Sequence, residues 1–119
     1  MLPPAETVAL PTLTGGYAIT GGACLLRGWS FVNTDDSNPA ALTLYDGSST
    51  DGPIVTAITL NPNESTRDYP AGAGIGIRTA LYIDVTLGSV TGAVWINPAT
   101  RVGDWELVSG ERLADFGLE

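Results

Sequence analysis

The sequence contains no histidine and no lysine, and it has a single cysteine, Cys24. Without histidine the chain lacks the commonest general base and the commonest transition-metal ligand. Without histidine or lysine, no hydroxyl or thiol has the usual neighbour that activates a nucleophile. One cysteine excludes an internal disulfide and cannot by itself form a zinc site. We therefore expect a protein that is not an enzyme and has no cofactor, and we expect Cys24 to be a buried free thiol.

Charged residues are also scarce, at 15% of the chain compared with about 25% in an average soluble domain. Thirteen acidic residues outnumber five arginines, which gives a net charge of −8. Such a chain has no basic face with which to neutralise phosphates, so nucleic acids and anionic membranes are excluded as partners. A surface of small polar and apolar residues suits a subunit that contacts its neighbours. It also suits a glycine- and threonine-rich secreted β domain.

The sequence has no long apolar run of the kind that spans a membrane as a helix. Residues 1–6 lack the basic region and apolar stretch of a signal peptide. We therefore expect synthesis in the cytoplasm.

Fifteen glycines and eight prolines divide the sequence into runs too short for helices. Turn residues at such short intervals are typical of a sandwich or barrel. Alternating apolar and polar residues predict strands at 17–20, 24–33, 41–45, 54–60, 65–69, 75–77, 81–87 and 90–96. We expect one all-β domain, an antiparallel β-sandwich of about eight strands with jelly-roll or Greek-key connections.

The two ends of the chain lack this alternation. Residues 1–14 contain three prolines and predict an extended N-terminal arm, with at most one edge strand around Thr7–Leu10. The sandwich then covers 15–97, and 98–119 form a C-terminal tail with a short helix of one or two turns. A helix this short needs a surface to dock on, either its own sandwich or a neighbouring subunit.

Carboxylates offer two further chemistries. A pair drawn from Asp46, Asp51, Asp68 and Asp84 is the one arrangement left for catalysis, but a domain of this size lacks a deep cleft for a sugar chain. The loop Asp46–Asp51 and the turn at Asp35 and Asp36 contain enough oxygen ligands for calcium. Because aspartate favours turns for conformational reasons, turn formation accounts for both segments more simply.

Arginines and aromatic residues are the remaining candidates for contacts. Arg27 precedes Trp29 by two residues on a predicted strand, which places guanidinium and indole side by side. Arg67 and Arg78 flank the glycine-rich connection and can pair with strand aspartates, or with carboxylates across an interface. Tyr45, Tyr69, Tyr82, Trp95, Trp29 and Phe31 fall on predicted strands, where core packing is the default. The candidate interface residues are Leu10, Leu13, Arg27, Trp29, Arg67, Arg78 and the tail residues Trp105 and Phe116.

Five segments carry a resemblance to a known group of proteins: Leu25–Phe31, Ala41–Gly47, Glu64–Tyr69, Gly76–Ile83 and Gly88–Ile96. Together they resemble the small virion structural proteins of tailed bacteriophages, namely head decoration proteins and small tail or fibre modules. The likeness covers roughly residues 15–97 and includes no catalytic motif. It implies a β-sandwich or jelly roll that is displayed in many copies and forms homotrimers.

These observations lead to one main hypothesis and two alternatives. The main hypothesis is a capsid decoration protein that binds the major capsid protein on the outside of the shell and stabilises it through non-covalent contacts. The first alternative is a receptor- or glycan-binding module of a tail or head fibre, in which exposed aromatic residues form the binding surface. The second is a calcium-dependent adhesion domain.

Overall fold

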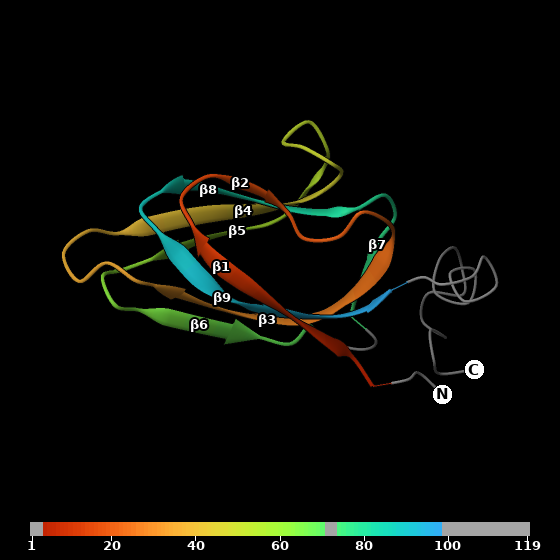
Figure 1. Ribbon diagram of the computed structural model, residues 1–119, viewed down its shortest axis with the longest axis horizontal. Coiled ribbons are helices and arrows are strands. Elements are labelled where there is room, and N and C mark those ends of the chain that lie inside the picture. The colour runs from red at the N-terminus through yellow and green to blue at the C-terminus, as the bar shows by residue number, and fades with distance from the viewer. Residues whose placement is uncertain (1–3, 71–73, 99–119) are drawn as a thin grey trace.

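The computed structural model describes residues 4–70 and 74–98, and every regular element among them is a β-strand (Figure 1). The strands are β1 (Glu6–Leu13), β2 (Gly16–Ala18), β3 (Cys24–Asn33), β4 (Ala40–Asp46), β5 (Ile54–Leu60), β6 (Ser65–Asp68), β7 (Ile75–Ile77), β8 (Leu81–Leu87) and β9 (Val90–Pro98). The eight predicted strands are all present, and β1 is a ninth. None of the described residues belongs to a helix that is long and apolar enough to cross a membrane.

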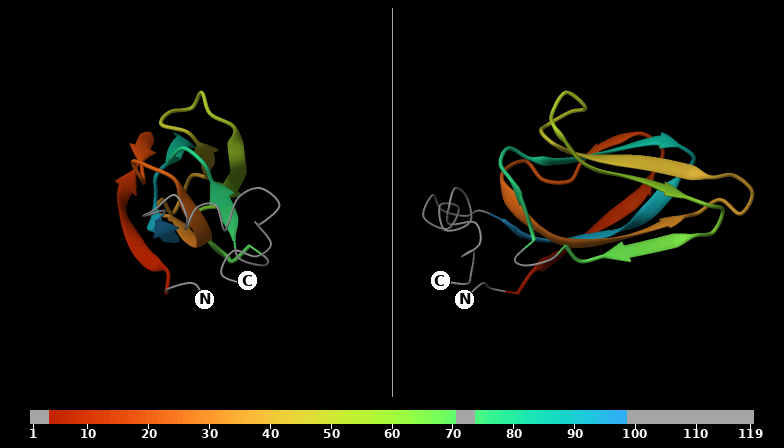
Figure 2. Two further views of the ribbon diagram at one scale, coloured as in Figure 1. Left: turned by 90° about the vertical axis from the view of Figure 1, so that its right-hand side faces the viewer. Right: turned by 180° about the vertical axis from the view of Figure 1, so that it is seen from behind.

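The strands form two antiparallel sheets that lie face to face (Figures 1 and 2). Sheet A has the order β1-β9-β3-β6, with β7 paired to the first residues of β3, and sheet B has the order β2-β8-β4-β5. The strand pairing is nested, as in one long hairpin folded over on itself: each pair encloses the previous one in the sequence, in the order β4–β5, β3–β6, β2–β8 and β1–β9. The prediction of an all-β antiparallel sandwich is therefore confirmed.

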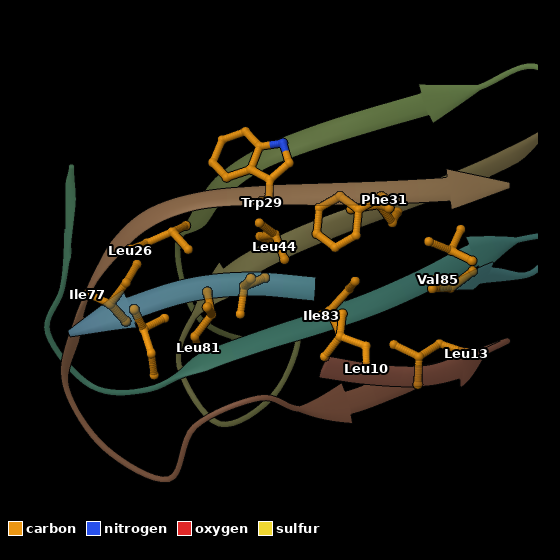
Figure 3. Packing of buried hydrophobic residues seen from close by; sticks show 14 of the residues in the cluster. Leu10, Leu13, Leu26, Trp29, Phe31, Leu44, Ile77, Leu81, Ile83 and Val85 are labelled. Carbon is orange, nitrogen blue, oxygen red and sulfur yellow. The ribbon is translucent and has the colours of Figure 1, made fainter. Parts of the chain in front are cut away.

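The hydrophobic core lies between the two sheets. Because successive side chains of a strand point to opposite faces, alternate residues of each strand enter it. Phe31 of β3, Leu44 of β4 and Ile83 of β8 are fully buried there, and Figure 3 shows the side chains that surround them. Burial of each such side chain contributes about 1.5–3 kcal/mol relative to exposure, so this cluster is the main source of stability.

A β-bulge at Arg27 interrupts this alternation in β3. Leu26 and Gly28 pair with consecutive residues of β9, so Arg27 is an extra residue in β3. The strand changes phase at this point, and both Leu26 and Trp29 enter the core. The prediction that Arg27 and Trp29 share one face is therefore wrong.

Asn33, a buried polar residue at the end of β3, joins two connections at one end of the sandwich. Its Nδ2 donates hydrogen bonds to the carbonyl oxygens of Asn38, at 2.8 Å, and Asn61, at 3.1 Å. Its Oδ1 accepts one from the backbone N–H of Asp35, at 2.9 Å. The β3–β4 and β5–β6 connections are thereby held together through one side chain.

Asn97, near the end of β9, has a comparable position at the other end of the sandwich. Its Oδ1 accepts a hydrogen bond from Nη1 of Arg27 at 2.7 Å, and its Nδ2 donates one to the carbonyl oxygen of Pro4 at 3.2 Å. The start of the described chain, the bulge in β3 and the last strand are therefore joined by Asn97.

Candidate interaction surfaces

Three of the candidate interface residues belong to the core. Leu10 and Leu13 of β1 are each 6% exposed, and Trp29 of β3 is 5% exposed. Residues 6–13, expected to belong to an extended arm, form the edge strand β1 along β9. The expectation that Leu10, Leu13 and Trp29 contact a neighbouring subunit is therefore corrected, because in this fold they stabilise the monomer.

The three arginines among these candidates lie at separate places. Arg27 is half-buried and contacts Asn97. Arg67 is exposed on β6, and Arg78 is exposed in the turn after β7, so neither is part of a buried arginine–aspartate network. The tail residues Trp105 and Phe116 lie outside the described residues, as does all of the predicted tail beyond residue 98.

An aromatic pair lies on the outer face of sheet A. Tyr69, just after β6, is 58% exposed, and its ring centroid lies 5.5 Å from that of Trp95 on β9, at an interplanar angle of 31°. Gly28 of β3 lies between them in the sheet, since it pairs with Trp95 and a β-carbon at position 28 would be 2.7 Å from Cδ1 of Tyr69. The absence of a side chain at Gly28 therefore leaves room for the Tyr69 ring beside β3.

A row of two tyrosines flanked by two aliphatic residues crosses the outer face of sheet B. Ala18, Tyr82, Tyr45 and Ile54 are neighbours on the four successive strands, and we call these four residues the aromatic row. Ile54 is 64% exposed, and both tyrosines are half-buried. The Tyr82 ring extends over β2, where its hydroxyl occupies the space next to Gly16 that a side chain would fill.

Sequence reasoning placed all these aromatic residues in the core by default, and for four of them this is wrong. Trp29 and Phe31 are buried, but Tyr45, Tyr82 and Trp95 are half-buried and Tyr69 is exposed. A signal was present in the sequence, because Tyr82 alternates with the apolar residues Leu81 and Ile83 and so belongs to the opposite face. The assignment to the core rested on residue type and did not take this alternation into account.

The carboxylates of Asp35 and Asp46 in the acidic turns accept hydrogen bonds from backbone N–H groups. Oδ1 of Asp35 accepts hydrogen bonds from the N–H groups of Ser37 and Asn38, and Oδ2 accepts one from Nδ2 of Asn38. The Asn38 side chain, followed by these N–H groups, lowers the pKa of Asp35. Asp46 accepts the N–H groups of Arg78 and Thr79, at 3.0 and 2.9 Å. No group of three potential ligands in 4–70 and 74–98 is arranged to hold a metal ion.

Cys24 is buried as a free thiol at the start of β3, as predicted. Burial, which disfavours the thiolate, raises its pKa from 9.0 to about 11, and this outweighs a hydrogen bond with Thr20. A thiol in this state is protonated at neutral pH and is a poor nucleophile.

Comparison with protein-family models, with curated proteins and with solved structures finds no match. The function must therefore be inferred from the two outer faces and from the strand edges.

Proposed function

We propose that this protein is a virion structural protein of a tailed bacteriophage, and specifically a capsid decoration protein that binds the outer surface of the shell. Its partner is the major capsid protein, and its place is the capsid surface. It acts by non-covalent contacts that connect neighbouring capsid subunits, with no catalytic step and no cofactor. The homotrimer implied by the resemblance belongs to this proposal.

The nested strand order supports this role at the level of the fold. The five-stranded sheet A, with the order β1-β9-β3-β6 and β7 paired to β3, and the four-stranded sheet B, with the order β2-β8-β4-β5, are consistent with a jelly roll that has β7 as an insertion before β8. Jelly rolls recur in viral capsid proteins and in lectins. Because one fold serves many functions, this argument is one of analogy, and the surface must supply the rest.

The observation that carries the proposal is the outer face of sheet B. The four strands of this sheet contain two charged residues, Asp46 and Asp84, and Asp46 is bound to the turn before β8. The face instead presents the aromatic row and, at its far end, Leu87, which is 51% exposed. Aromatic enrichment and few charges are typical of the centre of a protein–protein interface.

The charge of the chain suits the same orientation. With a net charge of −8, copies placed side by side on a shell repel one another, so their contacts with the surface beneath must outweigh this repulsion. A face with few carboxylates adds little electrostatic repulsion where it contacts the capsid. The acidic loops then face outward or sideways.

A binding experiment tests the proposal. Purified protein is mixed with expanded empty phage heads, and bound protein is measured after sedimentation across a range of concentrations. We expect saturable binding at a fixed ratio to the major capsid protein and a higher temperature of head disruption. Absence of binding by correctly folded protein contradicts the proposal.

Two alanine variants locate the contact. Tyr45→Ala removes an aromatic residue from the face of sheet B, and we expect it to weaken head binding by at least about tenfold, as for a residue central to an interface. Tyr69→Ala removes an aromatic residue of similar size from sheet A, and head binding should stay within about twofold. Equal losses in both variants would contradict the assignment to sheet B.

A second candidate function, glycan binding by a fibre module, is favoured by the Tyr69–Trp95 pair. The two rings form an exposed apolar platform next to polar residues, of the kind on which the apolar face of a sugar can stack. The net negative charge favours a neutral glycan. Retention on host-wall polysaccharide, lost in Trp95→Ala and kept in Tyr45→Ala, would support this function, and no retention of the wild type would remove it.

A further inference from the structure

The strand β5 forms one edge of sheet B, and nothing in its sequence protects that edge. It pairs with β4 on one side and has no partner strand on the other among the described residues. Its seven residues, Ile54–Leu60, include no charge, no proline and no glycine, and most are β-branched. An exposed edge of this composition is a template for pairing with another chain.

The other edges of the two sheets are protected in recognised ways. The strand β1 contains Glu6 and Pro11 and has an irregular register between Leu10 and Leu13. The strands β2 and β7 have three residues each, and β6 has four, two of which are Arg67 and Asp68. Short length, charge, proline and bulges each discourage pairing at an edge. Among the edge strands in 4–70 and 74–98, only β5 is seven residues long and contains no charged residue and no proline.

A bulge also occurs in β5, but it lies at one end. Thr56 pairs with Leu44 and Ile54 pairs with Tyr45, so Val55 is the extra residue. The part from Thr56 to Leu60 is regular, and its midpoint is Ile58. Five regular residues match the usual length of a strand in a sheet.

We propose that the edge of β5 binds a second copy of this chain, with the two β5 strands antiparallel and centred on Ile58. The two B sheets then form one continuous eight-stranded sheet. Backbone N–H and C=O groups along the edge supply the hydrogen bonds, as in other cases of strand addition. The exposed Ile54 adds apolar surface at each end of the seam.

The distribution of charge favours a second copy as the partner. In this register Ala57 faces Thr59 of the second copy, and the regular parts of both strands are uncharged. The nearest acidic residues, Asp51 and Glu64, lie outside β5, in the loop before it and the turn after it, so the paired segments contain no carboxylate. For a chain of net charge −8, this edge is therefore a place where two copies meet without direct repulsion.

The pairing closes after two copies. Each chain uses the one unprotected edge of its described strands, so the contact is the same on both sides and has a two-fold axis. The outer edge of the joined sheet is then β2, which has three residues. This inference is independent of the virion role. It concerns the free protein in solution, where it predicts a dimer, whereas the proposed homotrimer concerns protein bound to the shell.

The mass of the full chain in solution, measured by sedimentation equilibrium from roughly 1 to 100 μM, tests the inference. We expect a monomer–dimer equilibrium for the wild type. The variant Ala57→Glu/Thr59→Glu places carboxylates opposite carboxylates across the axis, and its dissociation constant should rise at least about tenfold. The uncharged variant Ala57→Gln/Thr59→Gln, with side chains of the same size, should dimerise like the wild type.

A charge-reversal experiment separates pairing from misfolding. The variant Ala57→Arg/Thr59→Arg should also be monomeric alone, and mixing it with the glutamate variant should restore a dimer. Slow hydrogen exchange at residues 54–60 should appear in the wild type and in this mixture, and should be lost in either charged variant alone. Thr12→Glu, on the exposed part of β1, should leave the dimer unchanged.

Three outcomes would overturn the inference. One is a trimer, and another is a dimer that the glutamate variant does not weaken. The third is a wild type that stays monomeric over the whole range, which would leave the β5 edge to a strand of another protein.

Discussion

The Tyr69 ring occupies the space next to Gly28 that a β-carbon at position 28 would fill. Gly28 lies on the neighbouring strand β3. A β-carbon at position 28 would lie 2.7 Å from Cδ1 of Tyr69 and 2.9 Å from the carbonyl oxygen of Asp68. The first contact can be relieved by movement of a side chain, but the second involves the backbone. The glycine is therefore required by the way in which β6 approaches β3.

Gly28→Ala should lower the free energy of unfolding by about 1–3 kcal/mol, as measured by urea denaturation, because it forces atoms into occupied space. Tryptophan fluorescence should also change, since Trp95 contacts the displaced ring. The control is Gly21→Ala, at a position where a β-carbon meets nothing within 4 Å, and its effect should stay within about 0.5 kcal/mol. Equal stability of the two variants would contradict this account.

Gly16 and Tyr82 form a similar pair on sheet B, and a double-mutant cycle measures their coupling. Gly16→Ala should be destabilising because the new methyl group collides with the Tyr82 hydroxyl. Tyr82→Phe removes that oxygen, so the loss caused by Gly16→Ala should be smaller in the Phe background. We expect a coupling free energy of at least about 0.5 kcal/mol from thermal or urea unfolding. Additive effects would show that the two residues do not touch.

Asn33 should be one of the least replaceable polar residues in the chain. Asn33→Ala removes the donor to the carbonyl oxygen of Asn38, one of the two donors to that of Asn61 and the acceptor of the Asp35 N–H, and we expect a loss of about 2–3 kcal/mol in unfolding free energy. Asn33→Asp keeps the shape but points a carboxylate at those oxygens, so it should be at least as harmful at pH 7. An aspartate variant as stable as the wild type would contradict the hydrogen-bond assignment.

The buried thiol makes stability depend on pH in the alkaline range. The folded pKa of Cys24, about 11, lies above the unfolded value, so between the two the folded state binds more protons than the unfolded state. The contribution of this thiol is therefore complete below about pH 9 and is lost as pH rises toward 11, by at most about 3 kcal/mol.

The measurement is urea unfolding at pH 8, 9, 10 and about 11, for the wild type and for Cys24→Ala. All other groups are the same in both proteins, so the informative quantity is the difference between their unfolding free energies. The advantage of the wild type should shrink as pH rises. In addition, a disulfide reagent should modify Cys24 in urea but not in the folded protein at pH 8.

Strand positions were predictable because alternation is a local property. The pattern of Ile54–Leu60 or Leu81–Leu87 is complete within each segment, and the glycines and prolines beside it mark the ends. Even β1, in a segment expected to be an arm, was anticipated around Thr7–Leu10. Its length was underestimated because Pro11 interrupts the pattern, although an edge strand accommodates proline.

The face of the sheet on which each side chain lies was harder to predict. The bulge at Arg27 adds one residue to β3, and its one local sign in the sequence is the adjacent Gly28, because a glycine inside a strand can mark a bulge or simply a close approach of another chain segment. After the bulge, each side chain of β3 lies on the face opposite to the one that simple alternation predicts. Trp29 therefore belongs to the core, while Arg27 contacts Asn97.

The candidate surfaces depend on which strands are neighbours, and local patterns do not contain this information. The aromatic row unites residues from four strands that are far apart in the sequence. Likewise, the limits of β5 were predicted, but its position at an edge follows only from the order of the whole sheet. The interface residues chosen from the sequence were selected by residue type, and burial then removed Leu10, Leu13 and Trp29.

The nested pairing of strands also dictates an order of folding. The strands β4 and β5 are joined by a short loop and can pair early, whereas β1 pairs with β9, for example Glu6 with Ile96. Because the entropy of closing a long loop must be overcome before such distant contacts form, we expect this pair to complete last. During synthesis on the ribosome, β1 emerges first and remains without its partner until nearly the whole domain has been made. A chain released before β9 is complete therefore exposes β1 and one side of β3, and is prone to aggregate.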